Sequence, residues 1–292
     1  MNHRQKYLSA CLSAVAALIV GAFPAFADAP APPSLGAASS FAVLSAAPGA
    51  GGAVTCTDST ITGDVGSSGA PASVVQTECT ITGAVIAPVS DQVLTDFNGA
   101  YDAFAAVSCG TTLTGTLAGV TLAPGVYCFD AAAALTGTLT LAGPSNGIWI
   151  FKIGTSGTGA LTGTNFSVVM ANGAQPCNVY WWVAQAVTMT TSGFQGTILA
   201  GAAITMTGLA VAPTTTFFNG DALAKGAVTL TNLIVTGCEG SIFNPPQQRC
   251  NQGVGNGPEG CDPGNSNQGD PARSNDEQGG VQGNPGRKGG NK

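Results

Sequence analysis

The sequence has very few charged residues and only one histidine. Asp, Glu, Lys and Arg make up 8% of the 292 residues, and the formal net charge is −6. The histidine, His3, lies in an N-terminal segment that we expect to be removed during export. Catalytic sites and metal sites that depend on histidine are therefore excluded from the mature chain.

Basic residues are the scarcest charged type in the body of the chain. Between Ser34 and Gly240, nine acidic residues are accompanied by only two basic ones, Lys152 and Lys225. Nucleic acids and anionic membrane surfaces are bound mainly through lysine and arginine, so we expect neither as a partner. Pectin-lyase-like enzymes, which are β-solenoids, use basic residues and calcium. This body has too few basic residues to indicate an activity of that class.

The acidic residues do not indicate an enzyme either. Asp64 and Asp221 each follow a glycine, where a carboxylate commonly accepts hydrogen bonds from turn amides. A glycosidase would need paired carboxylates in a groove lined by aromatic side chains. We therefore expect no enzymatic activity, no cofactor and no metal site.

Long apolar runs are absent except near the N-terminus. Residues 1–27 have the form of a signal peptide, with two basic residues, an apolar run and a final Ala25-Phe26-Ala27 cleavage site. No second apolar segment of about 18 residues follows, so we expect a secreted protein that does not insert into a membrane. Residues 28–34 are interpreted as a proline-containing linker.

The cysteines indicate disulfide bonds. Loss of residues 1–27 removes Cys11 and leaves eight cysteines, an even number that is typical of exported, disulfide-bonded chains. No C-x-x-C pair is present, so zinc binding is not indicated. The sequence alone does not settle the pairing. Order and spacing suggest Cys56 with Cys79, Cys109 with Cys128, Cys177 with Cys238, and Cys250 with Cys261.

Residues 35–240 contain a recurring short phrase of threonine, an apolar residue and threonine, here called the TxT phrase. It recurs about every 17 to 26 residues, with two longer steps of 32 and 50 residues. The related sequence LTGT at Leu161 divides the step of 50 residues into two. Such a repeat predicts a β-solenoid in which each phrase supplies one strand of a long parallel face. Because side chains alternate along a strand, the apolar residue would face the core and both threonines would face water. The phrases begin at Thr60, Thr80, Thr112, Thr138, Thr188, Thr205 and Thr229.

One helix is predicted within the long step between Thr80 and Thr112. Apolar residues from Val89 to Phe104 recur at spacings of three and four, and Ser90 is a suitable N-cap residue. We expect a helix over about residues 90–107, with its aromatic stripe covering one flank of the solenoid.

The last segment has a different composition. Residues 241–292 are rich in Gly, Asn and Pro and have almost no apolar residues after Phe243. Such a segment cannot bury enough apolar surface to offset its ordering entropy, so the sequence predicts a disordered tail apart from a possible loop between Cys250 and Cys261.

Several segments together resemble the microbial ice-binding protein family. They match its signature segments in order over nearly the whole body, from about Leu35 to Cys238. The segments are LGAASSFAVLSA at Leu35, ITGDVGSS at Ile61, LAPGVYCF at Leu122, LTGTLTLAG at Leu135, GIWIFKIG at Gly147, VVMANGAQPCNVYWWV at Val168, FQGTILA at Phe194 and NGDALAKGAVTLTN at Asn219.

The resemblance implies an all-β fold, a discontinuous right-handed parallel β-solenoid of triangular cross-section with one long flanking α-helix. It also implies interleaved N-terminal and C-terminal coils, and binding to ice through one flat face without a cofactor. At Trp182 the chain departs from the family pattern, which has Gln near this position, and we assign no binding role to Trp181 or Trp182.

The sequence therefore leads to two hypotheses about function. The first is an exported, monomeric antifreeze protein whose partner is an ice crystal surface, because an uncharged array of methyl and hydroxyl groups could order water. The second is an extracellular structural or adhesive solenoid, favoured if the threonines are scattered over three faces. The predicted ice-binding residues are Thr136, Thr138, Thr140, Thr162, Thr164, Thr188, Thr190, Thr205, Thr207, Thr229 and Thr231.

Overall fold

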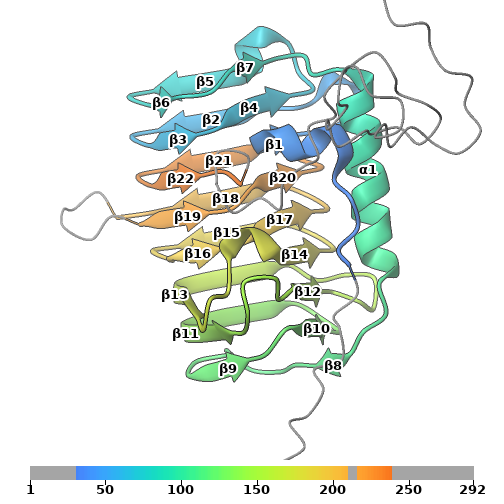
Figure 1. Ribbon diagram of the computed structural model, residues 1–292. Coiled ribbons are helices and arrows are strands. Elements are labelled where there is room, and N and C mark those ends of the chain that lie inside the picture. Colours follow the sequence, from blue (N-terminus) through green and yellow to red (C-terminus); the bar gives the residue numbers. More distant parts are fainter. Residues whose placement is uncertain (1–30, 210–215, 239–292) are drawn as a thin grey trace, which may run out of the picture.

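The chain forms a three-sided coil of parallel strands with one long helix along one side (Figure 1). The structure is a computed structural model that describes residues 31–209 and 216–238. The predicted signal peptide, the tail and the Cys250–Cys261 pair lie outside these residues. The expected all-β parallel solenoid with a flanking helix is confirmed.

The nine strands of the first sheet lie on the side covered by the helix, in the order β7-β4-β1-β20-β17-β14-β12-β10-β8. Their bounds are β1 Phe41–Ser45, β4 Asp64–Ser67, β7 Val85–Ile86, β8 Thr111–Thr112, β10 Gly125–Phe129, β12 Trp149–Ile153, β14 Val179–Val183, β17 Thr197–Ala200 and β20 Ala222–Ala224.

The second sheet has the order β5-β2-β21-β18-β15-β13-β11-β9. Its strands are β2 Val54–Thr57, β5 Val74–Thr77, β9 Val120–Leu122, β11 Ala133–Ala142, β13 Leu161–Ala171, β15 Val187–Thr190, β18 Ile204–Thr207 and β21 Val228–Thr231.

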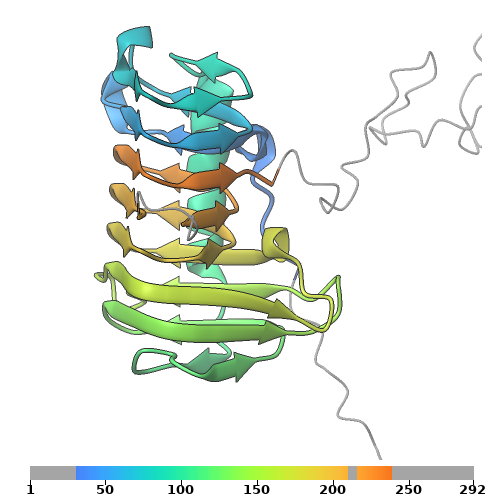
Figure 2. The same cartoon turned by 90° about the vertical axis from the view of Figure 1, so that its left-hand side faces the viewer.

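The third sheet has the order β16-β19-β22-β3-β6 and lies on the side that faces the viewer in Figure 2. Its strands are β3 Thr60–Thr62, β6 Thr80–Ile81, β16 Phe194–Gln195, β19 Phe217–Asn219 and β22 Ile234–Thr236. Four short 3₁₀ helices, η1 Gly36–Ser40, η2 Pro48–Ala50, η3 Pro71–Ser73 and η4 Pro176–Asn178, lie between strands.

Two strands of the second sheet are long enough to bend onto the third side. In β11 the pairing with β13 shifts between Leu135 and Gly137, and Gly137 has a positive φ of 72° that a side chain would disfavour. Beyond the bend, Ser167 of β13 bridges to Gly193, next to β16. The second halves of β11 and β13, together with β9, therefore extend the third side.

The N-terminal and C-terminal coils interleave, as the family resemblance implies. β1 lies between β20 and β4, β2 lies between β21 and β5, and β3 lies between β22 and β6. Strands far apart in the sequence thus become neighbours. The stack begins with the coil of β5, β6 and β7 and ends with β8 and β9 (Figure 1).

The interior of the coil is filled by the inward-pointing residues of all three sheets. It includes an aromatic stack in which the ring centres of Phe151 and Trp181 are 3.9 Å apart and the rings are nearly parallel. The apolar residues of the TxT phrases also point inward, and Leu139 and Leu230 are fully buried. This continuous apolar filling holds successive coils in register.

The helix α1, Asp91–Ala106, lies within one residue of the predicted limits at each end. Ser90 is its N-cap, and the Ser90 hydroxyl accepts a hydrogen bond from Val93 N. Phe97, Tyr101 and Phe104 of its buried stripe pack on the outer side of the first sheet. The central strands of the first sheet, from β1 to β10, consequently have buried residues on both sides.

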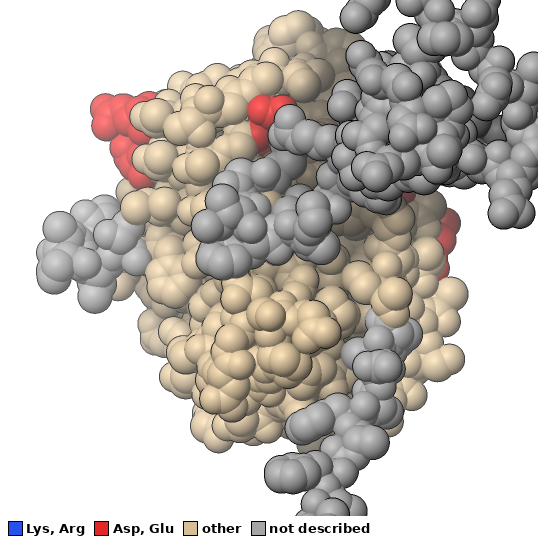
Figure 3. Space-filling view, viewed as in Figure 1, with Lys and Arg blue, Asp and Glu red and all other residues tan. Residues whose placement is uncertain are grey.

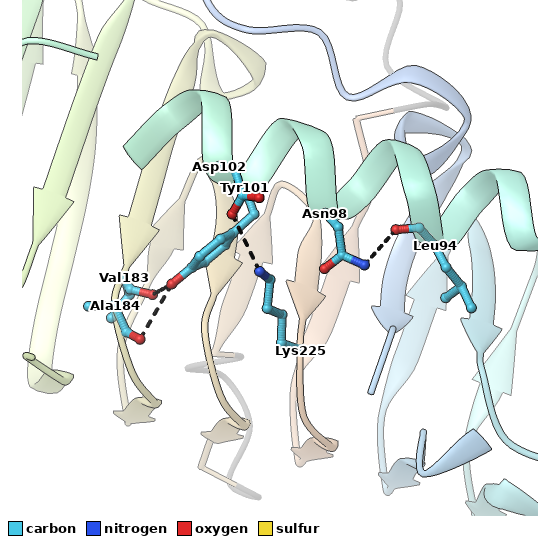
Figure 4. Close-up of polar contacts among 7 residues, drawn as sticks. All are labelled: Leu94, Asn98, Tyr101, Asp102, Val183, Ala184 and Lys225. Atoms are coloured by element: carbon cyan, nitrogen blue, oxygen red, sulfur yellow. Dashed lines mark hydrogen bonds and ion pairs between the residues drawn. The ribbon is translucent and has the colours of Figure 1, made fainter. Parts of the chain in front are cut away.

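Both lysines of the described residues hold the helix in place. The buried Lys152 Nζ donates hydrogen bonds to Ala105 O and Val107 O at the C-terminal end of α1. Lys225 Nζ lies 3.7 Å from an Asp102 carboxylate oxygen and 4.0 Å from the centre of the Tyr101 ring (Figure 4). Neither lysine is therefore part of an exposed basic surface.

Three of the suggested disulfides are present. Cys56 is bonded to Cys79, Cys109 to Cys128, and Cys177 to Cys238. The first joins the two outermost coils at the β5 end of the stack, and the second closes the opposite end. The third attaches the end of the last described coil to η4.

Candidate functional site

The second sheet aligns ten threonines in two columns, here called the threonine ladder. Its five rungs lie on β2, β21, β18, β15 and the first half of β13, and their pairing brings like positions together across neighbouring coils. The first column is Thr55, Thr229, Thr205, Thr188 and Thr162, and the second is Thr57, Thr231, Thr207, Thr190 and Thr164. Parallel strand geometry places neighbours about 4.8 Å apart within a column and about 6.7 Å apart along a strand.

Each rung has the same local pattern of an apolar residue, threonine, a small or apolar residue and threonine. In β15 the pattern reads Val187, Thr188, Met189 and Thr190, with the first and third residues buried and both threonines exposed. Because strand side chains alternate, the buried pair fixes the direction of the threonine pair. The core therefore supports the ladder from below at every rung.

The ladder hydroxyls are available to solvent. Thr162 Oγ1 lies 3.3 Å from Ala133 O, and within the described residues the other nine hydroxyls have no hydrogen-bond partner. Unpaired hydroxyls can both donate to and accept from water. Each also has a methyl group beside it on the same carbon, so the surface alternates polar and apolar contacts at fixed intervals.

No charged side chain belongs to the ladder. Asp58 follows the β2 rung, and Glu78 follows β5; both occupy corner positions with positive φ. In the space-filling view, which has the orientation of Figure 1, acidic side chains form a few separate spots and no basic side chain of the described residues is visible (Figure 3). The described part of the chain also contains no group of three or more His, Cys, Asp or Glu residues that could hold a metal ion.

The structure brings together eight of the eleven threonines selected from the sequence. These are Thr162, Thr164, Thr188, Thr190, Thr205, Thr207, Thr229 and Thr231. Thr138 and Thr140 lie in the second half of β11, where they pair with Ser167 and Val169 on the third side. Thr136 is in the bend before them, and its backbone N–H donates to Thr116 O at 3.2 Å.

The expectation that every TxT phrase contributes to one face is wrong. The phrases at Thr60 and Thr80 form β3 and β6 of the third sheet, and the phrase at Thr112 starts in β8 of the first sheet. The coils have three sides, and β-branched residues suit all of them. The TxT phrase therefore predicts the strands correctly but does not show on which of the three sides of the coil each strand lies.

Sequence reasoning missed the rung formed by Thr55 and Thr57. Its central residue is Cys56, whereas all seven phrases identified in the sequence have Ile, Leu or Met in the centre. The discriminating signal is the residue before the first threonine: it is Val, Ile or Leu in all five rungs but serine before Thr60 and cysteine before Thr80. That residue is buried and sets the strand on the second sheet.

Asp64 and Asp221 both have structural hydrogen-bond partners. Asp64 Oδ1 accepts a hydrogen bond from Ala84 N at 2.6 Å, and Asp221 Oδ1 accepts one from Cys238 N at 2.8 Å. Both carboxylates therefore hold corners of the coil, as expected. No helix within residues 31–209 and 216–238 has the length and apolar character needed to cross a membrane.

Comparison with known proteins gives a consistent result. The sequence profile of the ice-binding-like family matches residues 47–236. An ice-binding protein from the Antarctic ascomycete Antarctomyces psychrotrophicus is 32% identical, with a TM-score of 0.59 over 70% of this chain and 98% of that one. An ice-binding protein from an Antarctic biological consortium is 28% identical, with a TM-score of 0.62 over 74% and 95%.

A third similar structure is longer than this chain. It is an ice-binding protein from an Antarctic bacterium of the Flavobacteriaceae, 34% identical, with a TM-score of 0.60 over 70% of this chain but 47% of that one. No curated protein sequence gives a match.

Proposed function

Because the chain belongs to the ice-binding-like family, we propose that it adsorbs to ice through the threonine ladder and thereby inhibits ice growth or recrystallisation. The observation that carries this proposal is the alignment of ten outward threonines in two straight columns on one sheet. Ice-binding proteins of known structure share the fold at 32% and 28% identity.

The physical basis is an ordered layer of water on the ladder. Hydroxyl groups at regular spacings hold water molecules at regular positions, while the methyl groups between them exclude water from the intervening sites. A charged side chain would bind water strongly and in a geometry set by its own charge. The absence of charge from the ladder thus favours contact with a crystal surface.

Rigidity supports the same conclusion. A flat array held by a packed core and disulfides loses little conformational entropy when it meets a solid surface. The ladder hydroxyls are placed by backbone pairing, so they are in position before contact. We propose that the exported protein acts as a monomer, without a cofactor and without catalysis.

The deciding experiment is an ice-affinity partition of the mature chain, combined with measurements of thermal hysteresis and recrystallisation inhibition. The proposal predicts enrichment in the ice fraction together with at least one of the other two activities. A folded protein that is excluded from ice, shapes no crystal and leaves recrystallisation unchanged would contradict it. That result would favour the structural or adhesive solenoid.

A further inference from the structure

We infer that the ice-contacting surface continues beyond the last threonine rung onto the edge strand β5, where Val75 contacts ice in place of a threonine. This inference rests on the proposed function and extends its site. β5 pairs in register with β2, so Val75 lies beside Thr55 and Thr77 lies beside Thr57. Val75 thus ends the first column, and Thr77 ends the second.

Val75 has the shape that this position requires. Valine and threonine share the branched Cβ, and valine has a methyl group where threonine has the hydroxyl. The side chain of Val75 is 48% exposed, one of the most exposed large apolar side chains in the described residues. A single exposed valine is ordinary, but this one is in line with five threonine side chains. The methyl groups of the first column therefore continue onto β5, although Val75 has no hydroxyl group.

The disulfide between Cys56 and Cys79 holds this edge strand in position. β5 has a neighbour on one side only, and Gln76 and Thr77 in it are exposed. Cys79 follows β5 after one residue, and Cys56 is fully buried beneath the rung of Thr55 and Thr57. The bond joins the edge coil to the ladder directly below the array. It positions the rung of Val75 and Thr77 before contact with ice, which lowers the cost of ordering.

This rung is not recognisable from the sequence pattern. Val74 to Thr77 reads VVQT, which contains one threonine and no TxT phrase. Only the pairing of β5 with β2 places Val75 in a threonine column.

The test compares lysine substitutions at two matched positions. Val75→Lys places a charge in the first column, and Ile234→Lys places one on the third sheet, where Ile234 is 41% exposed on β22. At equal concentration, we expect V75K to lower thermal hysteresis at least about twofold, because its ammonium group would lose water against the crystal. I234K should keep the wild-type value, as should Val75→Thr, which restores the threonine column.

The outcomes separate this inference from the proposed function. Thermal melts first establish that each variant is folded. If V75K retains wild-type hysteresis while T207Y in the ladder loses it, the contact ends at β2 and the inference is wrong, although the ladder still binds ice. If V75K and I234K lose the same amount of hysteresis, an added positive charge lowers activity wherever it lies on the surface, and the inference is also wrong. If the wild-type protein has no ice activity, the proposed function itself fails.

Discussion

Threonine meets two requirements at each ladder position. Its β-branched side chain suits an extended strand, and its hydroxyl and methyl groups both reach the surface from one carbon atom. Serine would lack the methyl group, and valine would lack the hydroxyl. Thr207 is exposed in β18, with Thr190 and Thr231 on either side of it in the second column. A change there alters the contact surface while the buried Met206 continues to hold the strand.

Replacement of Thr207 by tyrosine tests the ladder at its centre. The ring would stand above the neighbouring threonines and keep them from a flat crystal surface. We expect T207Y to reduce thermal hysteresis by most of its value and to change the melting temperature little, since exposed substitutions usually alter stability by less than about 0.5 kcal/mol. The measurements are hysteresis at matched concentration and a thermal melt.

Thr138→Tyr is the matched control for T207Y. Thr138 is also an exposed strand threonine, with Ser167 as its neighbour on β13, but it lies on the third side. T138Y should remain active. Equal loss of activity in both variants would show that the contact extends onto the third side, and loss in T138Y alone would place it there.

At the scale of an element, α1 is joined to the coil by buried aromatic rings and by the few charges available. Tyr101 OH donates to Val183 O at 3.1 Å (Figure 4). The centre of its ring is 4.0 Å from Lys225 Nζ and 5.4 Å from the ring centre of Trp182. Tyr180 packs against Phe104 of the helix, with ring centres 5.1 Å apart. Burial, with a contribution from nearby carboxylates, raises the pKa of Tyr101 and of Tyr180 to about 12.

These two tyrosines should make the fold sensitive to alkali. Their pKa values in the folded state are above the ordinary value of 10.0, so the unfolded state loses its protons first as the pH rises. Below pH 10 both tyrosines are protonated in the folded and unfolded states, and between pH 10 and about 12 the fold loses up to roughly 2 kcal/mol of stability per tyrosine. Burial also lowers the pKa of Lys152. This shift reduces the stability of the fold at pH values where Lys152 of the unfolded state is protonated, that is, below about 10.5, and the reduction disappears as the pH rises.

A series of thermal melts from pH 7 to pH 12 measures this effect, with the double variant Tyr101→Phe, Tyr180→Phe as the comparison. At pH 7 the variant should be less stable by about 1 kcal/mol, because the hydrogen bond to Val183 O is lost. Above pH 10 its melting temperature should fall less steeply than that of the wild type. Parallel curves for the two proteins would refute the assignment to these tyrosines.

Across the whole molecule, the sequence predicted the features that depend on a local residue pattern, namely the individual strands and the helix. Alternation of Leu135, Leu139 and Leu141 with threonines gave the strand, and the spacing from Val89 to Phe104 gave the helix. The side of the coil on which a strand lies depends on the buried residue before the first threonine, on corner geometry and on the bend at Gly137, and the TxT phrase itself includes none of these. The rung of Thr55 is aligned with the others through the pairing of β2 with β21, which is far away in the sequence, and Val75 is aligned with Thr55 through the pairing of β5 with β2. The TxT phrase shows neither pairing.

The distribution of charge over the whole molecule leads to the final prediction. The ladder contains no titratable group, the two lysines of the described residues are engaged with α1, and the nearest acids, Asp58 and Glu78, are at its corner. Adsorption to ice should therefore be unchanged between pH 5 and pH 9, because no titratable side chain belongs to the contact surface. Recrystallisation inhibition at constant osmolality measures this directly. A change of severalfold within that range would mean that an ionisable group contacts the ice, and Asp58→Asn and Glu78→Asn would then identify whether it belongs to the corner.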